Sequence, residues 1–314
     1  MFKDDIYVII PTLNEEKSIK NVIEKIPKKI RNKSVSILII DGNSTDNTVN
    51  IAKKCGANVI LQESIGKGSA IQEALEKIDA EVVVTIDGDG TYDAEKMNEL
   101  VEPILDNRAD MVVATRLKYR EKDSISHFNI IGNKIFSFFV KWLFNKKITD
   151  MLSGYRAFNK KKLDNIILLS NKFEIETEIT IEAIRNNFRI LEIPLFYKKR
   201  IGKTKLHPIR DGFLILKTII LLLRDTKPIY FFGMIGIFFL LFSLWPVSLI
   251  LYEKIIYGKI IHLPSVVLAA FLILLGIQII ILGLLADMNL KNNKRMEIFI
   301  KKQLKRGIYE NKKA

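Results

Sequence analysis

The first part of the chain, to about residue 115, alternates between short apolar runs and longer polar stretches. The apolar runs are rich in Val and Ile and predict five strands, at 6–11, 35–41, 57–61, 81–89 and 110–116. The stretches between them have the length of helices, at 15–26, 46–54, 68–78 and 94–106. Because strands that alternate with helices form sheets covered on both faces, the pattern predicts an α/β fold with a mostly parallel sheet.

Two long uncharged runs follow near the C-terminus, at 229–252 and 266–286. Each is long enough to cross a bilayer core of about 30 Å, so we expect two transmembrane helices in a hairpin over 226–288. Two buried core helices are the alternative, but a compact domain seldom needs two such runs. The loop between the runs holds Lys254 and Lys259, whereas the tail at 289–314 holds nine basic residues. The positive-inside rule therefore predicts a protein of the cytoplasmic membrane with both termini in the cytoplasm.

Two further stretches, at 128–144 and 211–225, combine apolar residues with a few basic ones. They are too short or too charged to span a bilayer. The first contains Lys134 and Trp142, and the second leads into the first uncharged run. Helices of this kind either pack on the sheet or lie in the headgroup layer, with lysines toward lipid phosphates, and we favour the lipid bilayer surface for both.

The charge of the chain narrows the possible partners. It has 49 Lys and Arg against 35 Asp and Glu, a net charge of +14. Such an excess suits nucleic acid, an anionic membrane surface or phosphorylated ligands. Zinc-ligand spacing, RNA-binding signatures and recognition-helix patterns are absent from the sequence, so we expect no nucleic acid partner. The single cysteine, Cys55, excludes an intramolecular disulfide and agrees with a reducing compartment.

The segment TIDGDGTYD, at 85–93, places Asp87 and Asp89 on either side of Gly88. Alternate residues of a strand point to the same face, so both carboxylates should lie together at the end of the fourth predicted strand. Two adjacent like charges are unfavourable without a cation, and Mg²⁺ or Mn²⁺ bound by carboxylates and phosphates would compensate them. A tight turn alone would explain the glycines. The position at the carboxyl end of a strand, where such sheets bind ligands, favours a metal site.

At this point the chain resembles a known family. The segments YVIIPTLNEE (7–16), DGNSTDNT (41–48), GKGSAI (66–71) and TIDGDGTYD (85–93) look like glycosyltransferase family 2, with its GT-A fold. Three later segments are similar to the branch that uses polyprenol phosphate, which includes dolichyl-phosphate mannose synthases: TDMLSGYRAF (149–158), FEIETEI (173–179) and KKRIGKTKL (198–206). The resemblance covers roughly 4–225. It implies a GT-A catalytic domain at 1–210, followed by the surface helix at 211–225, the hairpin and the basic tail.

The resemblance also implies roles for individual residues on the donor side. Asp87 and Asp89 would hold the metal, with Thr91 at the next metal-facing position, where mannose synthases often have glutamine. The family usually has two aspartates where this chain has Asp41 and Gly42. The loop that carries Arg200 and Lys205 would close over the diphosphate of the donor. The residues implied in nucleotide-sugar binding are Pro11, Leu13, Glu15, Asp41, Lys67, Asp87, Arg200 and Lys205.

On the acceptor side, the resemblance assigns the acceptor phosphate to Arg116, at the end of the fifth predicted strand. Lys134 is a candidate to replace arginines that relatives carry near the first surface helix. Asp89, Arg116 and Arg200 would be the catalytic residues. Asp150, Ser153, Gly154 and Arg156 would shape the acceptor pocket, and we expect Glu176 and Glu178 to orient Arg156.

These roles imply an inverting transfer of a sugar from a nucleotide sugar to dolichyl or another polyprenyl phosphate. The acidic segments look closer to archaeal relatives that use UDP-N-acetylglucosamine, so we favour a UDP-sugar over GDP-mannose. A saccharide hydroxyl is an alternative acceptor, and it would need a general base such as Asp150 or Glu176. A non-catalytic membrane module that binds nucleotide or lipid phosphate is an alternative from another class, against which the intact acidic pair argues.

Overall fold

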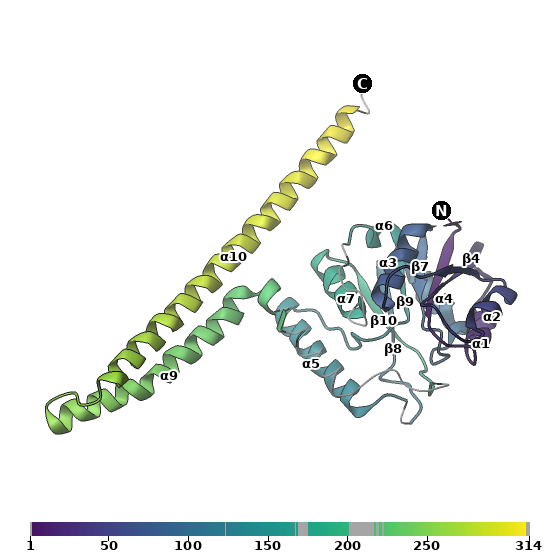
Figure 1. Cartoon of the computed structure of the whole chain (residues 1–314). Helices are drawn as coiled ribbons and strands as arrows, with labels where there is room; N and C mark the ends of the chain where they lie inside the picture. Colours follow the sequence, from purple (N-terminus) through teal and green to yellow (C-terminus); the bar gives the residue numbers. More distant parts are fainter. Residues whose placement is uncertain are drawn as a thin grey trace. The chain divides into compact units, whose positions relative to one another are not determined.

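The structure is a computed structural model, and it describes residues 2–122, 124–166, 168, 175–200, 217, 220–221 and 223–311 (Figure 1). The chain forms two compact units, Met1–Ile215 and Leu216–Ala314. Lys205, with the rest of the loop that follows Arg200, lies outside the described residues, as does most of the helix expected at 211–225.

An eight-stranded sheet forms the centre of the first unit, and it is mostly parallel, as the sequence predicts. Along the sheet the order is β10 (Ile190–Pro194), β8 (Met111–Thr115), β9 (Arg156–Asn159), β7 (Val82–Thr85), β2 (Ile6–Thr12), β4 (Lys33–Asp41) and β3 (Lys29–Ile30), and β5 (Asn58–Leu61) pairs with β4. Strand β9 runs antiparallel between β7 and β8, and β3 runs antiparallel to β4. The short strands β1 (Phe2–Lys3) and β6 (Ile78–Asp79) form a separate pair.

Helices cover both faces of this sheet, and the burial of β2 shows how. Val8 and Ile10 belong to a core cluster that includes α1 and α4. Tyr7 and Ile9 point to the other face and belong to a cluster that includes α3. A central parallel strand is buried on both faces, which is why its sequence reads as a continuous apolar run. The helices in the described part of this unit are α1 (Ile19–Lys25), α2 (Thr48–Lys54), α3 (Lys67–Lys77), η1 (Ala94–Lys96), α4 (Met97–Leu105), α5 (His127–Phe144), α6 (Lys160–Leu163) and α7 (Ile175–Arg185).

Helix α5 covers the stretch at 128–144, for which the sequence predicts a helix, and its place at the membrane surface stays a prediction. Its inner face buries Phe136 and Val140. Its outer face exposes four large apolar residues spaced four, three and four positions apart, which places them on one side of a helix. We call this set the apolar stripe: Ile131, Ile135, Phe138 and Trp142, with exposed fractions of 55, 43, 65 and 50%.

The second unit contains the helices α9 (Pro228–Tyr257) and α10 (Leu263–Asn311). The two uncharged runs lie within them, and each helix is long and apolar enough to cross a membrane. Most residues of the apolar windows are exposed, with 17% and 22% buried. The helices approach closely at two glycines, since a Cβ on Gly236 would lie 2.7 Å from the Gly276 carbonyl oxygen. Small residues at such crossings are typical of helix pairs in lipid.

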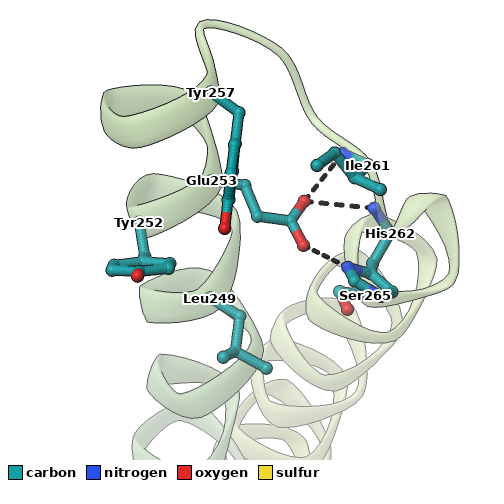
Figure 2. Close-up of a pocket in the computed structure, with 7 residues that line it drawn as sticks. All are labelled: Leu249, Tyr252, Glu253, Tyr257, Ile261, His262 and Ser265. Carbon is teal, nitrogen blue, oxygen red and sulfur yellow. Dashed lines mark hydrogen bonds and ion pairs between the residues drawn. The ribbon is translucent and has the colours of Figure 1, made fainter.

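The turn of this hairpin is organised by Glu253 (Figure 2). Its carboxylate accepts hydrogen bonds from the backbone N–H groups of Ile261, at 2.7 Å, and His262, at 3.1 Å, and it also contacts Nδ1 of His262. Both residues directly precede Leu263, where α10 begins, so this carboxylate fixes the backbone that leads into the helix. Tyr257 lies next to Glu253, and Tyr252 lines the same pocket.

Candidate active site

The acidic pair lies in a turn after β7. The strand ends at Thr85, so the prediction that both aspartates belong to the strand is wrong. Gly90 closes the turn with φ of +75°, a backbone conformation that glycine adopts without strain. Asp89 is buried, and the pKa of its carboxyl is raised by burial and by the nearby charge of Asp87. The two carboxylates are therefore close enough to repel each other.

Thr91 fixes the orientation of Asp89. Its backbone N–H and its hydroxyl donate to Oδ1 of Asp89, at 3.1 and 2.7 Å. Its carbonyl oxygen accepts from the backbone N–H of Lys198, at 2.8 Å, which joins the turn to the segment before Arg200. This geometry supports a positioning role for Thr91, and a direct contact with a metal stays a prediction.

Arg200 comes from a distant part of the sequence to the same turn. Its Nη2 lies 2.6 Å from Oε1 of Glu15, and its Nε lies 3.7 Å from Oδ2 of Asp89. That Nε is buried and has no hydrogen-bond partner among the described residues. A buried N–H group without a hydrogen-bond partner fits a site that receives an anionic ligand. A cation bound between that ligand and the two carboxylates would join Arg200 and the acidic pair in one site.

Lys67 lies at the start of α3, and its Nζ contacts two carboxylates. Oδ1 of Asp87 and Oε1 of Glu176, on α7, each lie 2.5 Å away. Burial alone would lower the pKa of Lys67, but the two negative charges outweigh it and raise the pKa, so the ammonium stays charged. We expected Glu176 to orient Arg156. Arg156 instead donates to a set of three oxygens that belong to Met151, Ser153 and Thr180.

Arg116 follows β8 and is held by Asp150. Its Nε and Nη2 donate to the two oxygens of that carboxylate, at 2.9 and 2.7 Å. Burial would raise the pKa of Asp150, but the charge of Arg116 outweighs it and lowers the pKa. The backbone N–H of Asp150 donates in turn to Glu192 on β10, at 3.0 Å.

Tyr197 links Arg116 to the acidic turn. The Arg116 guanidinium lies over its ring, 5.5 Å from the centroid. Burial raises the pKa of the Tyr197 hydroxyl, the charge of Arg116 opposes that rise, and the charge of Asp89 adds to it. Tyr197 therefore lies close to both Arg116 and Asp89. Sequence reasoning missed Tyr197 and Glu192, because neither belongs to a motif that distinguishes it from an ordinary sheet residue.

The remaining candidates are spread around this centre. Pro11 and Leu13 lie at the end of β2, where Leu13 is 42% exposed. Asp41 ends β4 and is fully buried, with its carboxylate accepting hydrogen bonds from the Thr12 hydroxyl and from the N–H and hydroxyl of Ser44. This supports a role in shaping the loop rather than in touching a ligand. Lys134 is exposed on α5.

Among the described residues, no group of three or more His, Cys, Asp or Glu side chains could hold a metal by itself. A pair of carboxylates is nevertheless enough for Mg²⁺ when substrate phosphates supply further oxygens. Asp87 and Asp89 fit that pattern, since Asp87 lies beside Lys67 and Asp89 lies beside Arg200, and both cations are able to bind phosphate.

Comparisons with known proteins identify the family of the chain. A family model described as glycosyl transferase family 2 matches residues 7–167. Glycosyltransferase AglJ of Haloferax volcanii is 32% identical over 91% of this chain and 93% of its own length. UDP-N-acetylglucosamine–dolichyl-phosphate N-acetylglucosaminyltransferase of Methanococcus voltae is 30% identical over 60% of this chain and 84% of its own.

Solved structures share the fold. Glucosyl-3-phosphoglycerate synthase of Mycobacterium tuberculosis, in complex with Mn²⁺, UDP and glucosyl-3-phosphoglycerate, matches with a TM-score of 0.57 and 22% identity over 71% of this chain and 80% of its own. The same synthase has been solved with Mg²⁺ and UDP. The sheet and its covering helices are thus those of a GT-A fold, and the chain belongs to glycosyltransferase family 2.

Proposed function

We propose that this chain transfers a sugar from a UDP-sugar to dolichyl or another polyprenyl phosphate, with inversion at the anomeric carbon. One observation carries the proposal: Asp89, Arg200 and Arg116 lie near one another past the carboxyl ends of the strands. Arg200 pairs with Asp89, and Arg116 lies over the ring of Tyr197. UDP-N-acetylglucosamine is the first candidate donor and GDP-mannose the second. The Methanococcus voltae relative, whose name gives UDP-N-acetylglucosamine as donor and dolichyl phosphate as acceptor, supports both choices.

On the donor side, Asp87 and Asp89 would hold Mg²⁺ or Mn²⁺, which when bound supplies positive charge for the departing diphosphate. The Nε of Arg200, which lies 3.7 Å from Asp89 and has no hydrogen-bond partner in the described part of the chain, would donate to a diphosphate oxygen. Thr91 keeps Asp89 in position through its two hydrogen bonds. These contacts favour charge stabilisation of the leaving group by groups that are already in place.

On the acceptor side, a phosphate monoester carries a charge of about −1.5 to −2 near neutral pH and is itself a nucleophile. Arg116 has five N–H donors and uses two side-chain nitrogens for Asp150, so donors remain for an incoming phosphate. Its planar guanidinium suits phosphate oxygens.

The contacts of the two candidate bases disfavour a saccharide hydroxyl as acceptor. Such a reaction needs a carboxylate that is able to take a proton from the hydroxyl. Asp150 is bound to Arg116, and Glu176 is bound to Lys67. A phosphate acceptor needs neither of them as a base.

The apolar elements would bring this site to a lipid headgroup. We propose that α9 and α10 span the cytoplasmic membrane, with both termini in the cytoplasm, and that the apolar stripe of α5 enters the headgroup layer. In this arrangement a water-soluble donor and a membrane-bound acceptor meet on the cytoplasmic side.

The test is a transfer assay with the full chain in detergent or liposomes. UDP-N-acetylglucosamine, UDP-glucose, UDP-galactose and GDP-mannose are each offered with Mn²⁺ and either dolichyl phosphate or a saccharide acceptor, and the product is identified by mass spectrometry. The expected product is a dolichyl-phosphate sugar from a UDP-sugar. A product formed only on saccharide acceptors, or from GDP-mannose alone, contradicts the proposal.

A further inference from the structure

Lys67, Asp87 and Glu176 form an ion triad between α3, the acidic turn and α7. The Lys67 ammonium lies 2.5 Å from an oxygen of each carboxylate. The Glu176 side chain is 9% exposed and the Lys67 side chain 14%, whereas that of Asp87 is 28% exposed. Glu176 is thus the enclosed partner of Lys67, and Asp87 is the partner that a ligand can reach.

The triad occupies the space that a side chain at position 154 would fill, because residue 154 is a glycine. A Cβ at that position would lie 2.6 Å from Oδ2 of Asp87 and 3.0 Å from Nζ of Lys67. The Gly154 backbone is fixed on both sides, because its N–H donates to the Tyr92 hydroxyl and its carbonyl oxygen accepts from the Thr85 hydroxyl. A side chain at 154 would therefore displace the triad rather than move away from it.

The triad conflicts with the metal role of Asp87 if nothing moves. An ammonium 2.5 Å from Oδ1 of Asp87 already supplies the positive charge that a divalent cation would bring. Two cations on one carboxylate repel each other strongly in a partly buried site. Glu176 pairs with Lys67 and is not one of the two residues expected to hold the metal, so this competition concerns Asp87 alone.

We propose that Lys67 is an exchangeable counter-cation: it pairs with Asp87 before a divalent cation binds, and it then passes to the diphosphate of the donor while Glu176 continues to hold it. This inference rests on the proposed function. Lysine suits such an exchange because its ammonium has three donors on a flexible stem, so it can keep one partner and change the other. Glu176 is then a positioning residue, and the donor's phosphate replaces the partner that Lys67 gives up.

The test measures binding to the full chain in detergent, with free Mn²⁺ followed by electron paramagnetic resonance and UDP followed by calorimetry. Lys67→Met keeps the apolar stem and removes the charge. It should tighten Mn²⁺ binding without nucleotide by about tenfold and weaken UDP binding at saturating Mn²⁺ by about tenfold, the size of one charge-assisted hydrogen bond. If Lys67 never leaves Asp87, Lys67→Met should tighten Mn²⁺ binding but leave UDP binding unchanged.

A second variant keeps the test valid if Lys67→Met does not fold. Glu176→Gln leaves Lys67 with Asp87 alone, so Mn²⁺ binding without nucleotide should weaken several-fold. Matched controls lie on the same two helices: Lys77→Met, which removes an exposed lysine paired with Glu63, and Glu182→Gln, which removes a partner of Arg185. Both controls should leave Mn²⁺ and UDP binding as in the wild type.

Two results would contradict the proposed exchange of Lys67. The first is unchanged UDP binding in Lys67→Met, and the second is unchanged Mn²⁺ binding in both Lys67→Met and Glu176→Gln. When the wild type nevertheless makes the lipid-linked sugar, only this inference fails. A wild-type chain that binds neither Mn²⁺ nor UDP contradicts the proposed function as well.

Discussion

Arg116 and Asp150 show how a single ion pair fixes one side of the site. Asp150 is fully buried, and both of its oxygens accept from the guanidinium. Removing one partner of a buried pair leaves an uncompensated charge, so Asp150→Asn should destabilise the fold by about 3–5 kcal/mol at neutral pH. The measurement is thermal unfolding in detergent, with Asp79→Asn, an exposed partner of Lys3, as the control.

The same pair has a pH dependence of known sign. Because Arg116 lowers the pKa of Asp150 below its ordinary value, the pair contributes stability that is present above about pH 4 and is lost as the pH falls through the folded pKa. The gap in unfolding temperature between the wild type and Asp150→Asn should therefore shrink as the pH falls below about 4. A gap that stays constant down to pH 3 would show that Asp150 acts through packing rather than through charge.

Asp89 gives the sharpest test among the residues of the acidic turn. Asp89→Asn keeps the two hydrogen bonds from Thr91 possible while it removes the charge. We expect loss of Mn²⁺ binding and a fall in transfer of about 100-fold or more, the size seen when a preorganised electrostatic contact is removed. A transfer rate within twofold of the wild type, with the fold intact, would exclude Asp89 from metal binding.

At the scale of elements, the sequence predicted what depends on local pattern. The β-branched runs gave the strands β2, β4, β5, β7 and β8, and the polar stretches gave the helices between them. Strand β9 (Arg156–Asn159) was not predicted from the sequence. It has four residues and begins with a buried arginine, so it lacks the apolar pattern that indicates a strand. Its antiparallel place between β7 and β8 depends on pairings across more than forty positions of sequence.

The candidate site shows the same division. Motifs indicated the acidic pair and Arg200, but the contact of Lys67 with Glu176 depends on how α7 packs, which no local spacing encodes.

Helix α5 carries a prediction that its own tryptophan can report. The chain has two tryptophans, Trp142 in the apolar stripe and Trp245 in α9. In Trp245→Phe, reconstituted into liposomes with brominated phosphatidylcholine, Trp142 fluorescence should be quenched if the stripe lies at the headgroup boundary. Trp142→Phe is the matched control, because Trp245 lies in the middle of an apolar helix. Quenching of Trp245 alone would mean that α5 faces water.

At the scale of the whole molecule, the unequal distribution of lysine predicts an orientation. The last turn of α9 holds Lys254 and the connection to α10 holds Lys259, whereas the tail from 289 onward has nine basic residues. Basic residues near the ends of a span favour the cytoplasmic side, so the turn should face outward. Because Cys55 is the single cysteine of the chain, it provides a native reporter for the catalytic unit. Lys259→Cys in a Cys55→Ser background should react with a membrane-impermeant maleimide in intact cells, while wild-type Cys55 should react only after lysis. The reverse pattern would put the acidic turn and Arg116 on the outer face, away from cytoplasmic nucleotide sugars, and the proposed reaction would then have no donor.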